Sequence, residues 1–110
     1  MNKNKYHNKA TFTADGIKHA SRKEANRWCE LKLLERAGKI SDLRRQVRYE
    51  LIPPQEGERA ATYVADFVYT DDNGNTIVED TKGGNATKTD AYVLKRKLML
   101  YIHNIRISEV

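Results

Sequence analysis

The sequence contains little cysteine and no long apolar segment. Its single cysteine, Cys29, excludes an intrachain disulfide and a zinc site built from cysteines. No apolar run approaches the roughly 20 residues that a membrane-spanning helix requires. Residues 1–5 are polar and basic, unlike the apolar segment of a secretory signal peptide. We therefore expect an intracellular protein that does not enter a membrane.

Basic residues outnumber acidic residues. The 110 residues include 20 Lys and Arg against 15 Asp and Glu, which gives a formal net charge of +5. Such an excess favours a polyanionic partner, for example a nucleic acid. Several carboxylates nevertheless occur in strand-like sequence, where exposure to solvent does not explain them. A basic chain with embedded carboxylates suits a protein that binds phosphates and holds a divalent cation against them.

Length and composition predict one domain with an α/β fold. The chain has 110 residues, of which 39% are hydrophobic, and can therefore bury one core. We expect a flexible basic N-terminal arm over residues 1–14 and a single domain over residues 15–110. The pattern favours a central mixed sheet flanked by helices, with an antiparallel hairpin and a late crossover strand. The predicted elements are helix 21–37, strands 44–52, 62–69 and 76–82, a helix from 88 or 89 to 102, and strand 104–108.

The first predicted helix carries a glutamate on its apolar side. At about 100° per residue, Glu24, Trp28, Leu31 and Leu34 fall in one sector. Ser21 and Glu24 also match the capping box that starts a helix. Glu24 therefore has two interpretations, one as a helix cap and one as part of a functional site. The start of a helix also attracts anions, and the place of Glu24 on the apolar stripe favours the site.

Two strand carboxylates and one lysine form the main candidate site. Side chains alternate along a strand, so Asp80 and Lys82 point to one face, and Val64, Asp66 and Val68 share a face of the preceding strand. An Asn-Gly turn predicts that the two strands pair, which would bring Asp66 and Asp80 together. Carboxylates that close repel each other unless a cation lies between them. Oxygen ligands of this kind suit Mg²⁺ or Mn²⁺.

The strength of this interpretation differs among the three residues. Asp80 and Lys82 alone could be polar residues at an edge strand, and a second D/E-x-K triplet, 30–32, lies in the predicted helix. Asp66 is stronger, because an unpaired carboxylate in an apolar strand costs about 3 kcal/mol or more. We expect Asp66 and Asp80 to bind a metal that activates water. Lys82 would orient that water or stabilise charge on a phosphate.

Further basic and polar residues are candidates for contacting nucleic acid. Lys95 falls on the apolar side of the second predicted helix, from which its ammonium can reach a phosphate. Thr89 is interpreted first as a helix cap, and its hydroxyl as a possible DNA contact. The basic run 44–48 can follow a phosphate backbone, and Gln46 within it can reach the site. The complete set is Gln46, Arg48, Lys88, Thr89 and Lys95.

Other polar residues receive ordinary interpretations. His7, His19 and His103 are not at ligand spacing from one another, although His19 lies close to the helix glutamate. Arg96 and Lys97 are interpreted as solvated. The chain contains neither a Ser/His/Asp arrangement nor a glycine-rich phosphate-binding motif. These absences leave a metal-dependent site as the best-supported chemistry.

Together these residues resemble the PD-(D/E)xK nuclease superfamily. Asp66, followed by a hairpin turn and then Asp80 and Lys82, resembles its motif, and Ala65 stands where many members have proline. More narrowly, the chain resembles a small phage-encoded family catalogued as a domain of unknown function. The segments that carry these resemblances, besides the motif, are 20–25, 78–83 and 92–98, within a total span of 16–107.

The resemblance implies a restriction-endonuclease-like core and Mg²⁺-dependent hydrolysis of DNA phosphodiester bonds. Branched or recombination intermediates are the expected substrates, with nicking of DNA as another form of the activity. Asp66 and Asp80 would bind Mg²⁺, for which Mn²⁺ can substitute, and the Thr81 carbonyl would be a further ligand. Lys82 would be the catalytic lysine, and Glu24 a ligand or water-positioning base.

Two other functions also fit the sequence. The first is a non-catalytic DNA-binding accessory protein with a nuclease-like fold, against which the complete set of acidic positions argues. The second is an RNA-directed nuclease, since nothing in the sequence separates DNA from RNA. A domain of this size holds one centre, so cleavage of both strands would require a homodimer or a second engagement. If a phage encodes the protein, its location would be the host cytoplasm.

Overall fold

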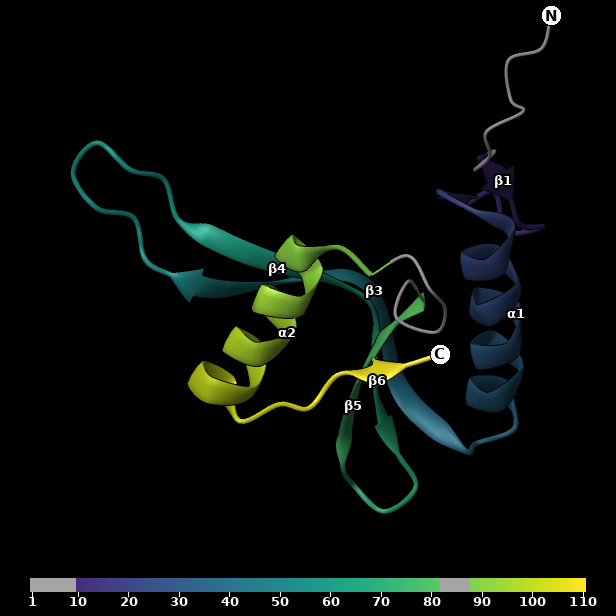
Figure 1. Ribbon diagram of the computed structural model, residues 1–110. Coiled ribbons are helices and arrows are strands. Elements are labelled where there is room, and N and C mark those ends of the chain that lie inside the picture. The colour runs from purple at the N-terminus through teal and green to yellow at the C-terminus, as the bar shows by residue number, and fades with distance from the viewer. Residues whose placement is uncertain (1–9, 82–87) are drawn as a thin grey trace, which may run out of the picture.

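The computed structural model describes residues 10–81 and 88–110, which form an α/β fold (Figure 1). A central sheet has the strand order β3-β4-β5-β6, and a separate small sheet pairs β1 with β2. The predicted mixed sheet flanked by helices is confirmed. The elements are β1 (Thr11–Phe12), β2 (Lys18–His19), α1 (Arg22–Arg36), β3 (Ile40–Ile52), β4 (Ala61–Asp71), β5 (Thr76–Asp80), α2 (Asp90–His103) and β6 (Ser108–Glu109).

The sheet topology combines an antiparallel meander with one parallel crossover. Strands β3, β4 and β5 pair antiparallel in sequence, and Phe67 of β4 lies opposite Glu79 of β5. The chain then passes through α2 and returns as β6, which pairs parallel to β5 with Ser108 opposite Glu79. Parallel neighbours need such a crossover, usually a helix. The predicted hairpin and late crossover strand are therefore confirmed.

Two strands begin well away from their predicted starts. β3 begins at Ile40 rather than residue 44, and the positive φ of 54° at Asp42 interrupts the alternation that a sequence pattern requires. β6 begins at Ser108 rather than residue 104, because Asn104 ends α2 in a left-handed conformation. Ile107 packs into the core before β6 begins. Local backbone geometry, which apolar patterns do not encode, moves both boundaries.

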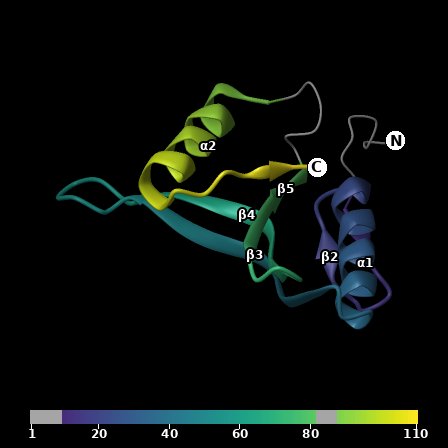
Figure 2. The ribbon, with the colours of Figure 1, turned by 90° about the horizontal axis from the view of Figure 1, so that it is seen from below.

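The two helices pack against different sets of sheet residues. Tyr92 and Met99 of α2 join one apolar cluster, and Trp28 and Leu31 of α1 join another. Figure 2 shows the helices on either side of β5, with the sheet between them. Leu34, predicted to lie on the buried stripe of α1, is 37% exposed. Strand residues of the α2 cluster are Leu51, Tyr63, Ala65, Val68 and Val78, and those of the α1 cluster are Ile40, Phe67 and Tyr69.

The side-chain alternation of β4 breaks at its centre. Ala65 and Val68 both belong to the α2 cluster, although they are an odd number of residues apart. Phe67 belongs to the α1 cluster, and Asp66 lines a pocket beside α1. The alternation therefore breaks between Ala65 and Phe67, at the position of Asp66. Val64 and Asp66 line one pocket, as their predicted shared face requires, and Val68 packs in the α2 cluster.

The backbone of β3 is irregular at the residue that lies opposite Asp66. Gln46 lies opposite Asp66 and has a φ of 55°, in the left-handed region that L-residues rarely occupy. Such a residue bends its strand and persists only where the surrounding structure holds it. Beyond the bend, the β3–β4 hairpin projects away from α1 (Figure 1). The strand pairs on either side of this rung are Arg45–Phe67 and Val47–Ala65.

The described N-terminal residues form a small hairpin on α1. Thr11 pairs with His19, and the indole N–H of Trp28 donates a 2.7 Å hydrogen bond to Asp15 in the intervening turn. The predicted domain boundary at residue 15 falls within this hairpin, while residues 1–9 lie outside the described part of the chain. Neither helix in the described part has the length and apolarity that crossing a bilayer requires.

A buried carboxylate ties α1 to the sheet. Glu79 of β5 is 1% exposed and accepts two hydrogen bonds from Arg27, at 2.8 Å from Nε and 2.6 Å from the terminal nitrogen. The Tyr69 hydroxyl donates to the same carboxylate, and burial with this bond raises the pKa of Tyr69 to about 12. Removing Glu79 would take this acceptor from the buried Tyr69 hydroxyl and leave Arg27 with its contact to the exposed Glu30.

Glu79→Ala should lower the free energy of unfolding by about 3 kcal/mol, the usual cost of breaking a buried ion pair. Urea denaturation would measure this loss. Glu50→Ala, at an exposed position of β3, is the matched control and should stay close to wild type. Equal midpoints for the two variants would show that the Arg27–Glu79 contact does not stabilise the fold.

Candidate active site

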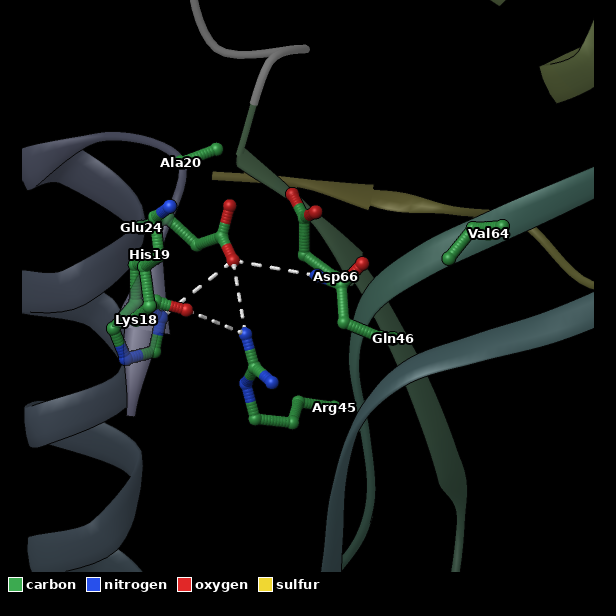
Figure 3. Close-up of a pocket in the computed structure, with 8 residues that line it drawn as sticks. All are labelled: Lys18, His19, Ala20, Glu24, Arg45, Gln46, Val64 and Asp66. Atoms are coloured by element: carbon green, nitrogen blue, oxygen red, sulfur yellow. Dashed lines mark hydrogen bonds and ion pairs between the residues drawn. The ribbon is translucent and has the colours of Figure 1, made fainter. Parts of the chain in front are cut away.

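A pocket of about 530 Å³ opens beside the bend of β3 and β4. One side is formed by β2 and the first turn of α1, and the other by the paired strands (Figure 3). Basic, acidic and amide side chains meet there within a small volume. The pocket is lined by Lys18, His19, Ala20, Glu24, Arg45, Gln46, Val64 and Asp66.

Glu24 uses its backbone for the helix cap and its carboxylate for the pocket. Its amide N–H donates to Ser21 Oγ at 3.1 Å, as the capping box predicts. Its Oε2 accepts a hydrogen bond from Gln46 Nε2 at 3.3 Å. The same oxygen lies 3.6 Å from His19 Nδ1 and 3.8 Å from an Arg45 terminal nitrogen (Figure 3). The helix cap therefore involves the Glu24 amide, whereas its carboxylate, which a complete capping box would bond to the Ser21 amide, contacts the side chains of the pocket.

The environment of Glu24 disfavours the ionised form of its carboxylate. Burial, followed by the charge of Asp66, raises the pKa of Glu24, while His19 and Arg45 lower it in part. A low-dielectric site disfavours the charged form, and a second carboxylate nearby adds repulsion. A cation in this pocket would relieve both effects.

Asp66 is fixed by the residue that follows β5. Its Oδ2 accepts hydrogen bonds from the amide N–H and the hydroxyl of Thr81, both at 2.8 Å. These bonds offset part of the cost of placing a carboxylate in an apolar strand. Thr81 was predicted to contribute its carbonyl to a metal, and that role stays a prediction. Its observed contribution is to orient Asp66.

Asp80 lies next to Asp66 across the sheet. The Phe67–Glu79 pair places Asp66 and Asp80 on the next rung of the same antiparallel ladder. Asp80 is fully buried and accepts a 2.6 Å hydrogen bond from the Tyr63 hydroxyl. Burial and this bond raise the pKa of Tyr63, with further contributions from the charges of Asp80 and Asp66. Tyr63 thus lies within electrostatic range of both strand carboxylates.

The residues of the pocket fit a hard cation in donor type. Within residues 10–81 and 88–110, no group of three or more His, Cys, Asp or Glu side chains is arranged to hold a metal. Mg²⁺ commonly uses only one or two carboxylates, together with water and substrate phosphate oxygens. Glu24 and Asp66 supply such oxygens on one pocket, and the repulsion between them favours a cation. Lys82 lies outside the described residues, so its catalytic role stays a prediction.

Lys95 and Thr89 line a second pocket of about 300 Å³ on the other side of Val64. Thr89 caps α2 as predicted, because its hydroxyl accepts the Tyr92 amide N–H at 3.1 Å. Lys95 is exposed at the same pocket. Since Val64 also lines the first pocket, the two hollows adjoin across β4.

The remaining candidate nucleic-acid contacts already have protein partners. The Lys88 ammonium lies 2.9 Å from Glu109, and Arg48 donates to the Thr62 hydroxyl at 3.4 Å. Gln46 bonds Glu24, as described above. Arg96 was predicted to be solvated, and that interpretation is wrong, because its guanidinium also bonds Glu109 at 3.0 Å. These contacts do not test nucleic-acid binding, for which Arg48 and Lys88 stay predictions.

Two residues of the pocket had received other interpretations from the sequence. His19, interpreted as an ordinary polar residue, is only 1% exposed and faces Glu24. Arg45, placed in a phosphate-following basic run, contacts Glu24 and donates to the Lys18 carbonyl at 3.2 Å. The only signal for His19 was its proximity to Glu24, because β2 is too short for an alternation pattern. Nothing local distinguished Arg45 from its basic neighbours.

Comparison with known families supports the narrower of the two resemblances. A family model described as a protein of unknown function, DUF1064, matches residues 3–108. The chain belongs to the DUF1064 family. No curated protein and no solved structure matches it. The expected relation to a small family of unknown function is thus confirmed for DUF1064, and membership of the nuclease superfamily stays a prediction.

Glu24→Gln should remove a pH-dependent penalty from this DUF1064 chain. Between the pKa of an ordinary glutamate and the raised pKa of Glu24, the folded state binds the proton more tightly than the unfolded state. Wild-type stability should therefore fall as pH rises through that window and level off above it. The Gln variant cannot titrate, so it should lack this fall and be at least as stable as wild type at neutral pH.

Thermal unfolding in EDTA, from acid to neutral pH, would measure both curves. Glu50→Gln, at an exposed site, should follow the wild-type slope. If Glu24→Gln melted well below wild type at neutral pH, the contacts of the Glu24 carboxylate with Gln46, His19 and Arg45 would outweigh its burial and the repulsion from Asp66.

Proposed function

We propose that this protein is a metal-dependent endonuclease that hydrolyses DNA phosphodiester bonds. The observation that carries the proposal is the grouping of three buried carboxylates from three elements. Asp66 of β4 adjoins Glu24 of α1 at one pocket and Asp80 of β5 across the sheet. Burying carboxylates this close together costs free energy unless a cation offsets their repulsion. Such a cost is usually retained only where the carboxylates have a function. The chain as a whole has a net charge of +5, and Lys18 and Arg45 line the pocket with Glu24 and Asp66.

The order of these residues supports the nuclease assignment. Asp66, then Asp80 with Lys82 two positions later, and an upstream Glu24 on the first helix resemble the PD-(D/E)xK pattern. The strands that carry the two aspartates pair antiparallel through a tight turn, as that pattern requires. On this basis Asp66, Asp80, Glu24 and the Thr81 carbonyl are the proposed metal ligands, and Lys82 is the proposed catalytic lysine.

The side chains of the pocket can divide the chemistry of hydrolysis among them. A bound Mg²⁺ would supply Lewis-acid activation of water and offset charge on the phosphate. Glu24, whose pKa is raised, is suited to accept a proton from the attacking water. Thr81 and Tyr63 hold Asp66 and Asp80 as hydrogen-bond acceptors, so both carboxylates keep fixed orientations. Preorganised groups of this kind lose little free energy to reorganisation during reaction.

The arrangement of the two pockets supports a path for the nucleic acid. They adjoin at Val64, with Lys18 and Arg45 in the first and Lys95 in the second. A strand crossing β4 at Val64 would have cationic side chains on both sides of Asp66. The β3–β4 hairpin extends away from α1 (Figure 2). Arg48, exposed on this hairpin, is a further proposed phosphate contact.

Asp66→Asn and Asp80→Asn should each lower the cleavage rate at least about 100-fold, because each removes a carboxylate from the proposed metal site. Supercoiled, linear and four-way-junction DNA, incubated with Mg²⁺ or EDTA, would measure this. Asp72→Asn, at the exposed hairpin turn, is the matched control and should cleave as wild type does. Identical products from wild type and Asp80→Asn would rule out the catalytic proposal.

An RNA substrate of the same sequence belongs in the same experiment. Cleavage of DNA with little cleavage of RNA is expected. Preferential cleavage of RNA would retain the phosphodiesterase chemistry but reassign the substrate. Binding of DNA without cleavage of either polymer, in Mg²⁺ or Mn²⁺, would contradict the enzyme proposal and favour an accessory DNA-binding protein.

Lys95→Ala should weaken DNA binding and reduce the salt dependence of binding by about one phosphate contact. The physical reason is the loss of an exposed ammonium at the second pocket. Titrations of DNA at several salt concentrations would give the slope. Lys97→Ala, also exposed on α2, is the control for charge alone. Equal slopes for the two variants would show that Lys95 has no particular role.

A further inference from the structure

We propose that His19 is a positioning residue for Glu24, held in place by the N-terminal hairpin. This inference rests on the proposed function, because it assigns His19 a role in the same site. His19 lies in β2, outside the carboxylate and lysine positions that the nuclease resemblance supplies. Its assignment comes from the contacts of its two ring nitrogens.

The Nδ1 atom of His19 faces the Glu24 carboxylate and makes no hydrogen bond within the described part of the chain. It lies 3.6 Å from Glu24 Oε2, slightly beyond hydrogen-bond distance. Among the described residues, it is one of two buried side-chain atoms without a hydrogen-bond partner, and Arg45 Nε is the other. A buried polar atom left unsatisfied costs about 1–3 kcal/mol. Hydrogen bonds of catalytic groups are often long before substrate binds and shorten in the complex.

The opposite side of the ring is fixed by the hairpin. His19 Nε2 lies 3.3 Å from the Thr13 hydroxyl oxygen, and that hydroxyl donates to Asp15. Asp15 in turn accepts the 2.7 Å hydrogen bond from the Trp28 indole. These bonds from Thr13 and Trp28 lower the pKa of Asp15 to about 2, so it stays an acceptor. The chain of contacts ends on α1, the helix that carries Glu24, which fixes the ring relative to the carboxylate.

All three side chains around Glu24 contact the same oxygen. His19, Gln46 and Arg45 converge on Oε2, as the dashed lines in Figure 3 show. Within the described part of the chain, no hydrogen bond is made to Oε1 of Glu24. The arrangement holds one oxygen and leaves the other available to the pocket that Asp66 also lines. Residues that orient a ligand in this way change metal affinity or activity by about 10-fold to 100-fold when mutated.

Two substitutions of His19 separate its two contacts. The Asn side-chain amide reaches the position of Nδ1, and the Gln amide reaches the position of Nε2. His19→Asn keeps a donor towards Glu24, whereas His19→Gln keeps only the contact with Thr13. We expect His19→Gln to lower kcat about 10-fold to 100-fold and to raise the Mg²⁺ concentration needed for half-maximal rate. His19→Asn should restore most of both values.

Controls separate positioning from stability. His103→Asn, at an exposed site on α2, tests the effect of losing a histidine elsewhere. Thermal unfolding of each variant shows whether the fold persists under assay conditions. If His19→Asn and His19→Gln lost activity equally, or if only His19→Asn lost it, the positioning role would be wrong. Loss in His19→Asn alone would instead assign His19 to the hairpin contact with Thr13.

A second measurement does not depend on cleavage. Carboxyl-carbon NMR of the metal-free protein gives the pKa of Glu24 directly. Loss of the donor in His19→Gln should raise this pKa above its value in His19→Asn, since a hydrogen bond to the carboxylate favours its charged form. Equal values would overturn the positioning role even if wild type proved inactive. An inactive wild type with the expected NMR order would instead contradict only the proposed function.

Discussion

The bend at the Gln46–Asp66 rung is the constraint on which the site depends. In a regular strand, Ala65 and Phe67 would share one face and Val68 would lie on the other. In this structure Ala65 packs with Val68 in the α2 cluster and Phe67 packs in the α1 cluster, while Asp66, between them, lines the pocket beside α1. The positive φ of Gln46 is a local cost that this arrangement requires, and its side-chain amide then bonds Glu24. One irregular rung thus joins the helix glutamate to a strand aspartate.

Much of this fold follows from periodicity and turn chemistry. The capping serine, Ser21, and the Asn-Gly turn mark a helix start and a hairpin at the positions where the structure has them. Asp66 also stands out, because a carboxylate in an apolar strand demands a partner. The break in alternation does not follow, since a left-handed Gln46 has no sequence signature. Patterns of apolar residues assume regular strands, so they do not place Ala65 and Val68 in the same cluster.

The role of His19 was hidden for a different reason. It lies in a two-residue strand, and its burial depends on contacts between a hairpin, a helix and a bent sheet. Thr13 and Asp15 show no pattern that links them to His19 before the hairpin folds. Long-range contacts of this kind arise only when separate elements meet. For the same reason the N-terminal hairpin, which resembles a simple extension in sequence, belongs physically to the pocket.

Glu79 and Asp80 are neighbouring buried carboxylates with different hydrogen-bond partners. Both are almost completely buried on β5, and they point to opposite faces. Glu79 meets the full guanidinium of Arg27, so its charge is neutralised within the protein. Asp80 receives a neutral hydroxyl from Tyr63, which satisfies one oxygen but adds no positive charge, and Asp66 is next to it. A structural carboxylate acquires a counter-charge from the fold. Asp66 and Asp80 are neighbours on adjacent strands, and this closeness of two buried carboxylates is the feature from which we propose a metal ion at this site.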